Sequence, residues 1–294
     1  MIAIGILQEM VLINRFKSVG ATDIGRRQNN EDTFLIDHDL GLFLVADGVG
    51  GHMAGEIASA TAVASIRELI LERVKNLATA NKSIVADAPS LSKNTHSIKL
   101  KLERDRELVR ASLDYASNAI FVEGQRLLTA EGRSMSTTIV GMFLQDGNDG
   151  DATIFNVGDS RLYVFRDRKL IQVSTDHSAF QEWLSQGRPG PEPSRNIILQ
   201  ALGQSPSVDP SVQSERLVSG DLILMCTDGL TDYLDDEIIT KHLECLDRNE
   251  PKTGCVNLIN AAIAAGGADT VSYTHLRAHE TRLDLVCRLL LEKK

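Results

Sequence analysis

The sequence predicts a mixed α/β (α+β) protein whose strands are long and antiparallel. Short apolar runs recur along the chain, separated by turns of Gly, Asp and Asn, some of them of hairpin length. Two longer stretches instead repeat apolar residues at intervals of three and four, which is typical of amphipathic helices. The chain has 294 residues, of which 43% are hydrophobic and 24% charged, so it can bury a large core in one or two domains.

The first predicted strands flank a glycine-rich turn. We expect a strand at residues 33–37, a hairpin link at 39–41 and an apolar strand that ends on Asp47. Four glycines follow Asp47 within eight positions, and residues without a Cβ allow tight turns and close approach of the backbone. One carboxylate and one bare carbonyl at such a strand end can hold a hard cation such as Mg²⁺ or Mn²⁺. An Asp-Gly pair alone is more often simply a turn.

Two helices are expected between residues 55 and 128. The first begins at Gly55, and its apolar residues share one face: Val63, Ile66, Ile70, Val74 and Leu77. The second is predicted over residues 104–128. Residues 78–103 between them are polar and aperiodic, so we expect an exposed loop or insertion there.

The second half of the chain contains further strands and one long irregular segment. Strands are predicted at residues 136–144, 152–157 and 161–166. Residues 178–215 hold five of the seven prolines and the only Trp, so we expect a long surface excursion over a site. An apolar run then ends on Asp228, helices are expected at 235–246 and 253–265, and a last strand should follow Asp269.

Composition excludes several classes of protein. A net charge of −9 argues against nucleic acid as a general partner, because binding a phosphate backbone needs a basic surface. The four cysteines lack the paired spacing of metal or redox sites, which predicts reduced thiols in a cytoplasmic protein. Residues 1–19 are interpreted as a short leader rather than a signal peptide. No stretch reaches the roughly 18 apolar residues that a membrane span needs.

Acidic residues end or flank apolar strands at Asp32, Asp47, Asp228 and Asp269. Antiparallel neighbours can bring these ends to one edge of a sheet. Clustered carboxylates repel one another unless a cation neutralises them, which is how a binuclear metal site is built. Taken singly, each acid is more simply interpreted as a strand end in water.

Seven short motifs give the chain a family resemblance. They are Arg27-x-x-Asn30-Glu31-Asp32, Val45-Ala46-Asp47-Gly48-Val49-Gly50-Gly51-His52-x-x-Gly55-Glu56, Ser136-Thr137-Thr138, Asn156-Val157-Gly158-Asp159-Ser160-Arg161, Thr175-Asp176-His177-Ser178, Cys226-Thr227-Asp228-Gly229-Leu230 and Gly267-Ala268-Asp269. In this order they resemble the metal-dependent protein phosphatase 2C family, and its bacterial members in particular, over residues 20–271. Seven motifs in order are highly specific, unlike any one of them alone.

The resemblance implies a fold and a reaction. The fold would be a β-sandwich of two antiparallel sheets flanked by helices on both sides, with residues 20–271 as the catalytic domain and the excursion at 178–215 as a mobile flap. The activity would be that of a protein serine/threonine phosphatase, in which a water bridging two Mg²⁺ or Mn²⁺ ions attacks phosphoserine or phosphothreonine directly. Such a water loses a proton near neutral pH, so no phosphoenzyme is required.

The resemblance also implies a role for each site residue. Asp47 would bridge both metals and the Gly48 carbonyl would ligate one of them, while Asp228 and Asp269 would ligate the other. Glu31 and Asp32 resemble acids that hold metal-bound water, and Asp159 resembles the acid that holds a third metal together with Asp228. Arg27 would clamp the phosphate, because a guanidinium can grip two phosphoryl oxygens in a fork. Arg26 is interpreted as its solvated neighbour.

Several other candidates fail on spacing. Some relatives, chiefly eukaryotic, carry a histidine two residues after the bridging aspartate that is proposed to protonate the leaving group; Val49 stands there in this chain. His52 is therefore assigned to packing at the helix start, with a metal-bound water as the alternative proton donor. Met53 replaces the third glycine of a dinucleotide loop. His275 and His279 lack the other elements of a zinc motif, and Ser160 lies in no nucleophile elbow.

The C-terminal segment departs from the family. Thr270 stands where the family has Asn, and the segment YTHLRAHETRLDLVCRLLLEKK at residues 273–294 makes a poor central strand. It resembles the conceptual translation of a sequencing adapter more than a protein-coding sequence. Our hypothesis is that residues 272–294 are a divergent, non-native tail that packs badly, or forms a stray helix from Leu283, and leaves one sheet strand incomplete.

Two alternatives to an active protein phosphatase are kept open. One is a catalytically silent, metal-binding regulatory module of the same fold, and the other is a phosphomonoesterase that acts on small substrates. The full set of acids, together with Arg27, favours the active enzyme over the silent module. The expected partners of an active enzyme are phosphorylated proteins and a serine/threonine kinase whose action it opposes.

Overall fold

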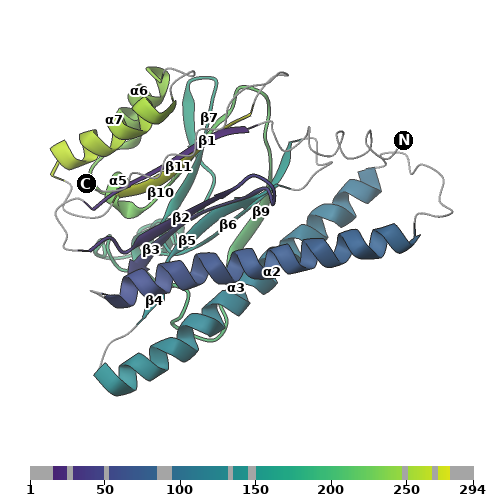
Figure 1. Ribbon diagram of the computed structural model, residues 1–294. Coiled ribbons are helices and arrows are strands. Elements are labelled where there is room, and N and C mark those ends of the chain that lie inside the picture. Colours follow the sequence, from purple (N-terminus) through teal and green to yellow (C-terminus); the bar gives the residue numbers. More distant parts are fainter. Residues whose placement is uncertain are drawn as a thin grey trace, which may run out of the picture.

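Two antiparallel sheets form the centre of the computed structural model, which describes residues 16–24, 29–49, 53–84, 95–131, 135–144, 150–246, 251–266 and 271–278 (Figure 1). The first sheet has the order β1 (Phe16–Asp23), β11 (Val271–Ala278), β10 (Leu222–Cys226), β7 (Arg161–Arg166) and β8 (Lys169–Gln172). The second has the order β2 (Asp32–Asp37), β3 (Leu42–Val49), β5 (Ile139–Phe143), β6 (Asp151–Val157) and β9 (Ser211–Arg216), with β4 (Ser136–Thr137) against β3. The predicted mixed fold with antiparallel strands is confirmed.

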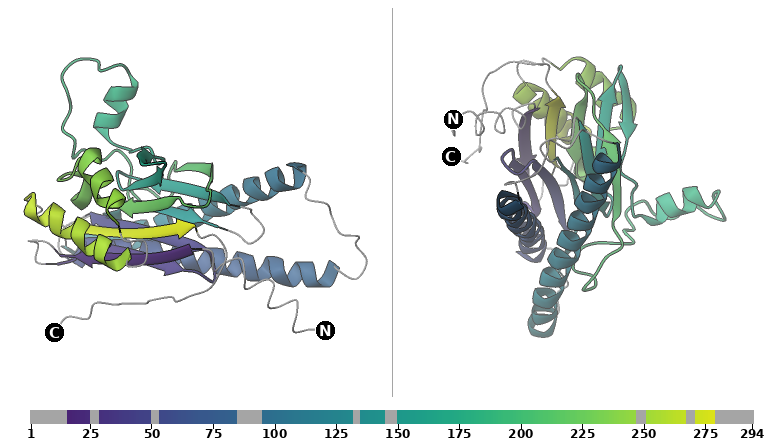
Figure 2. Two further views of the ribbon diagram at one scale, coloured as in Figure 1. Left: turned by 90° about the horizontal axis from the view of Figure 1, so that it is seen from above. Right: turned by 90° about the vertical axis from the view of Figure 1, so that its right-hand side faces the viewer.

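Helices cover the outer face of each sheet, so the molecule has four layers (Figures 1 and 2). Helices α2 (Met53–Ile84) and α3 (Thr95–Glu131) pack on the second sheet, and α6 (Asp236–Glu244) and α7 (Pro251–Ala264) on the first. Strand β3 is buried on both faces, which explains why its residues 42–46 are all apolar. Leu42 and Leu44 pack in the core under α2 and α3, whereas Phe43 and Val45 pack in the core between the sheets, because successive side chains point to opposite faces.

The expectation of an exposed loop at residues 78–103 is wrong for residues 78–84 and 95–103, whereas residues 85–94 lie outside the described ranges. Helix α2 continues to Ile84 and α3 already begins at Thr95, so both helices are longer than predicted. The middle parts of the two helices pack against each other and against the second sheet, through residues such as Ile66, Ile70 and Leu113. The added turns extend helices that are already formed, and Leu100 in one of them is 60% exposed, so they follow from helix propagation and not from burial. None of the helices in the described ranges is long and apolar enough to cross a membrane.

Strand β11 overturns the expectation of an incomplete sheet. It lies between β1 and β10 and pairs with both, with Ser272 opposite Thr22 and Thr274 opposite Met225. One of its polar side chains is accommodated by a hydrogen bond: the fully buried Ser272 hydroxyl donates to Thr22 Oγ1 at 2.7 Å. Strand β1 starts at Phe16, within the segment expected to be a leader. The non-native origin of residues 273–294 stays a prediction.

The excursion at residues 178–215 is shorter than predicted, because β9 takes Ser211–Arg216 into the second sheet. We call residues 178–210 the flap. Helix α4 (Ala179–Ser185) lies in it and projects away from the sandwich, as Figure 2 shows in both views. The ends of this projection are held by bridges from Ser178 to Ile198 and from Leu202 to Thr137.

Candidate active site

Two of the predicted acids face each other across neighbouring strands. Asp32 on β2 and Asp47 on β3 are register partners, so their side chains lie on the same face at the same end of the second sheet. The next residue, Gly48, donates its amide to the Glu31 carbonyl at 3.1 Å. Glu31 itself is buried, with 6% of its surface exposed. The sequence prediction that strand ends bring these acids together is borne out for this pair.

The glycines beside these acids are required by close packing. A Cβ added at Gly55 would collide with the Glu31 carboxylate and approach the Gly48 carbonyl. One added at Gly48 would collide with the Gly55 carbonyl and the Glu31 backbone. Helix α2 therefore starts directly against the strand ends, and the Glu31 side chain and the Gly48 carbonyl oxygen converge on the same small volume.

Thr137 and Thr138 hold Asp47 in place through its backbone. The Asp47 carbonyl accepts from the Thr137 hydroxyl at 2.7 Å and from the Thr138 amide at 2.8 Å. The Asp47 amide donates to Thr138 Oγ1 at 3.2 Å. Sequence reasoning quoted this threonine pair only as part of the resemblance, and its role in fixing Asp47 became visible only from these contacts.

Asp228 approaches from the other sheet. It follows β10 and opens α5 (Asp228–Thr231), a single turn that the sequence analysis missed because it is too short for a periodic pattern. Its neighbour Thr227 donates from its hydroxyl to Asp32 Oδ2 at 3.1 Å, a contact that joins the two sheets at the site. Three of the four predicted acids are thus brought to one end of the sandwich.

The electrostatics of Asp32 match a cation site. The pKa of Asp32 is raised to about 7, chiefly by burial and also by the charge of Asp228, while hydrogen bonds from Ser272 and Thr227 oppose the rise. Asp32 Oδ1 is also buried without a hydrogen-bond partner among the described residues. A buried carboxylate oxygen with no donor is costly, and a divalent cation would satisfy it.

Asp159 lies in the turn between β6 and β7, at the same end of the molecule. Burial raises its pKa to about 7, with further contributions from the charges of Asp228, Asp176 and Asp232. The charge of Asp228 raises the pKa of both Asp32 and Asp159, so the three carboxyl groups are close enough to interact electrostatically. Such an arrangement favours an added cation over three ionised acids.

The donor set fits a hard divalent metal. It consists of carboxylates and one backbone carbonyl, and oxygen ligands of this kind suit Mg²⁺ and Mn²⁺. Within the ranges described above, no three His, Cys, Asp or Glu side chains are close enough to form a complete metal site by themselves. Asp269, Arg27, Arg26, His52 and His279 lie outside those ranges, so the predicted phosphate clamp and fourth acid stay predictions.

Ser160 and His177, which were also considered from the sequence, make hydrogen bonds within the fold. Ser160 is fully buried and shares a 2.7 Å hydrogen bond with Thr138 Oγ1. His177 contacts Ser211 Oγ through Nε2 at 3.0 Å, and burial lowers its pKa. Among the cysteines that are described, Cys226, Cys245 and Cys255 are free thiols, as predicted.

Comparisons with known proteins agree with this geometry. Residues 19–255 match the family model described as protein phosphatase 2C. The chain is 28% identical over 274 residues to the protein phosphatase PhpP of Streptococcus pneumoniae, covering 88% of this chain and 96% of that protein. It is 29% identical over 259 residues to the serine/threonine protein phosphatase PstP of Mycobacterium tuberculosis, covering 84% of this chain. It spans only 41% of that relative's length.

A solved structure resembles the whole fold. It is the catalytic domain of the serine/threonine protein phosphatase PstP in complex with two manganese ions. The likeness has a TM-score of 0.68 at 26% identity, and it covers 90% of this chain and 99% of that one. The agreement therefore extends over both sheets and the helices that cover them.

Proposed function

Because the chain belongs to the protein phosphatase 2C family, we propose that it is a metal-dependent protein serine/threonine phosphatase that hydrolyses phosphoserine and phosphothreonine. The observation that carries the proposal is the arrangement at one end of the sandwich: Asp32 and Asp47 are register partners, Thr227 next to Asp228 binds Asp32, and Asp32 Oδ1 lacks a donor among the described residues. Dependence on a divalent metal follows from the family and from this all-oxygen donor set.

We assign the residues to roles by this arrangement and by their motifs. Asp47 and the Gly48 carbonyl would hold the first metal, and Asp47 would also reach a second one together with Asp228 and Asp269. Glu31 and Asp32 would orient water beside the pair, and Asp159 with Asp228 would hold a third metal. When bound, the metal pair supplies a water that is deprotonated near neutral pH.

The chain's own residues provide the rest of the reaction. Arg27 would grip two phosphoryl oxygens and so align the phosphorus for in-line attack. Thr137, Thr138 and Thr227 keep Asp47 and Asp32 in fixed positions, so the acids need no rearrangement when the substrate binds. The substrates would be phosphorylated proteins, and a serine/threonine kinase acting on the same proteins would be the opposing enzyme. We propose the cytoplasm as its location, in keeping with its free thiols.

The test is hydrolysis of a phosphothreonine peptide with and without Mn²⁺, in the parent and in Asp47→Asn and Asp228→Asn. The matched control is Asp39→Asn, the same substitution in the exposed turn at the other end of the β2–β3 hairpin. We expect activity that needs metal, that survives in Asp39→Asn and that is lost in the two site variants. A folded parent without activity would favour the silent regulatory module, and hydrolysis of p-nitrophenyl phosphate alone would favour a small-substrate enzyme.

A further inference from the structure

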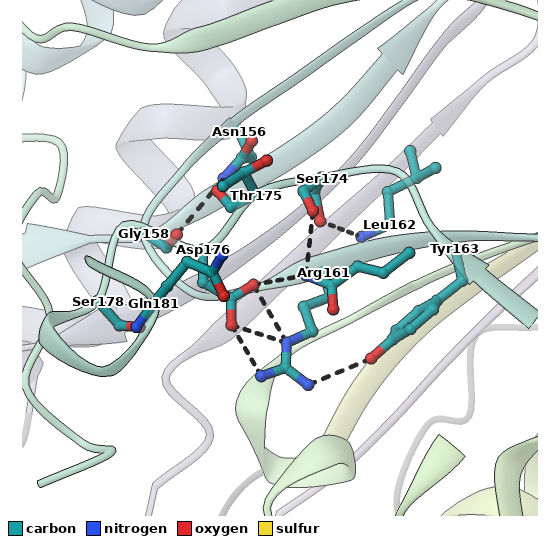
Figure 3. A network of polar contacts seen from close by, with 11 residues as sticks. Asn156, Gly158, Arg161, Leu162, Tyr163, Ser174, Thr175, Asp176, Ser178 and Gln181 are labelled. Atoms are coloured by element: carbon teal, nitrogen blue, oxygen red, sulfur yellow. Dashed lines mark hydrogen bonds and ion pairs between the residues drawn. The ribbon is translucent and has the colours of Figure 1, made fainter. Parts of the chain in front are cut away.

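A buried ion pair lies beside the candidate site, and the proposed reaction does not use it. The Arg161 guanidinium, at the start of β7, grips the Asp176 carboxylate with Nε at 2.9 and 3.1 Å and with a terminal nitrogen at 2.7 Å (Figure 3). The other terminal nitrogen donates to the Tyr163 hydroxyl at 3.2 Å. Gln172 donates to Asp176 Oδ1 at 2.8 Å, so this buried carboxylate is fully engaged.

Asp176 belongs to the segment that leads into the flap, and this segment is tied to the turn that carries Asp159. The Asn156 side chain donates to the Thr175 carbonyl at 2.7 Å, and the His177 amide donates to the Gly158 carbonyl at 2.8 Å. Ser178, the next residue, caps the N-terminus of α4. The flap root and the Asp159 turn are therefore joined by two hydrogen bonds and by the Arg161–Asp176 pair.

The same turn is connected to Asp47. Ser160, between Asp159 and Arg161, shares a hydrogen bond of 2.7 Å with Thr138 Oγ1. That threonine in turn exchanges two hydrogen bonds with the Asp47 backbone. Hydrogen bonds and short covalent links thus run from the flap root through the ion pair to Asp47.

We propose that Arg161 and Asp176 are positioning residues that hold the Asp159 turn and the flap root in register with Asp47. The inference rests on the proposed phosphatase function, and it adds that this ion pair fixes the geometry of the site. Contacts from two guanidinium nitrogens to one carboxylate fix the direction as well as the distance between the two segments, which a single hydrogen bond does not do. The positive charge of Arg161 lies against Asp176, a carboxylate whose charge contributes to the raised pKa of Asp159.

The strand β7 offers a matched control at its other end. Arg166 grips Asp221 through two nitrogens at 2.8 and 2.7 Å, and Asp221 is 1% exposed. The two arginine side chains are equally accessible, at 29% and 30%. Five strand residues separate them by about 17 Å. Both pairs should contribute to stability, but only the Arg161 pair touches the segments around the site.

The experiment compares Asp176→Asn with Asp221→Asn by kcat and KM on the Mn²⁺-activated phosphothreonine peptide, and by thermal unfolding. We expect Asp176→Asn to lower kcat about 10-fold or more, because misplacing reacting groups by about 1 Å can cost on the order of 100-fold. KM should change much less, and Asp221→Asn should keep the parent kcat despite a similar loss of melting temperature. Equal kcat losses in the two variants would overturn the proposal.

A second measurement does not depend on activity. Arg195 is exposed in the flap, and trypsin should cleave after it faster when the flap root is released. We expect faster cleavage in Asp176→Asn than in Asp221→Asn under native conditions, and equal rates would contradict the positioning role. An inactive parent would refute the proposed function, whereas the cleavage rates would still decide this inference. If Asp176→Asn does not fold, Arg161→Lys, which keeps the charge but loses the fork, takes its place in both assays.

Discussion

We predict that the Thr227 hydroxyl contributes more to the free energy of unfolding than any other single oxygen between the two sheets. Thr227 is fully buried in the link between β10 and α5. Its hydroxyl donates to Asp32 Oδ2 at 3.1 Å and accepts from the Ser272 amide at 3.2 Å. One hydroxyl can serve both partners because it carries one donor and two lone pairs. Thr227→Val keeps the shape of the side chain and removes both bonds.

The expected cost follows from these two contacts. A hydrogen bond to a charged group contributes about 1.5–3 kcal/mol, and an amide left buried without an acceptor costs about 1–3 kcal/mol. We therefore expect Thr227→Val to lower the free energy of unfolding by about 3–5 kcal/mol at pH 8, where Asp32 is ionised in the folded parent. The loss should be smaller at pH 5.5, where Asp32 is protonated and the first contact becomes a bond between neutral groups.

Urea unfolding in the presence of EDTA, followed by far-UV circular dichroism, measures this loss. Tryptophan fluorescence is unsuitable, because the only Trp of the chain is Trp183 in α4 of the flap. Thr227→Ser is the control, since it keeps the hydroxyl and loses only a methyl group. The reasoning is refuted if Thr227→Val is as stable as Thr227→Ser at pH 8.

Three further predictions concern the carboxylates expected to hold metal, the close packing at Gly55 and the central strand β11. With metal chelated, the urea concentration at half unfolding should decrease as the pH is raised from about 5.5 to 8. The folded-state pKa values of Asp32 and Asp159, about 7, exceed the ordinary 3.8, so the stability gained from their protonation is complete below pH 3.8 and is lost as pH rises through 7. Asp32→Asn should flatten the dependence and Mn²⁺ should restore the midpoint at pH 8, whereas a rising midpoint would contradict the assignment. Gly55→Ala should abolish peptide hydrolysis, because its Cβ collides with the Glu31 carboxylate, whereas Gly124→Ala in α3 should leave hydrolysis intact; kcat of both variants checks this. Thr274→Pro should cost about 3 kcal/mol or more of unfolding free energy, because it breaks the ladder of a strand paired on both sides. Thr274→Val should be neutral or stabilising, since Thr274 Oγ1 is buried and has no hydrogen-bond partner among the described residues; equal midpoints for the two variants would contradict a central β11.

Local sequence patterns were sufficient to predict a helix or strand wherever its buried residues recur at regular intervals along it. The face of α2 formed by Val63, Ile66 and Ile70 is buried as predicted, and the strands that end near Asp47 and Asp228 lie where the apolar runs indicated. Patterns failed at the ends of the two long helices and at β11. Residues 78–84 and 95–103 are helical because they extend helices formed elsewhere, and β11 is a central strand despite its polar composition because β1 and β10, both distant in sequence, pair with it.

The sequence by itself determined the family, the order of the motifs and the acids that can hold a metal, because these depend on residue types at short spacings. Only the tertiary structure decided which of them meet. The Asp32–Asp47 register, the Thr227 contact between sheets and the Arg161–Asp176 pair join residues that are 15 to 195 positions apart. Such pairings depend on strand register within a sheet, on the path of the chain after a strand and, for Thr227, on how the two sheets pack face to face. No local pattern records the distance between groups that the chain brings together only on folding.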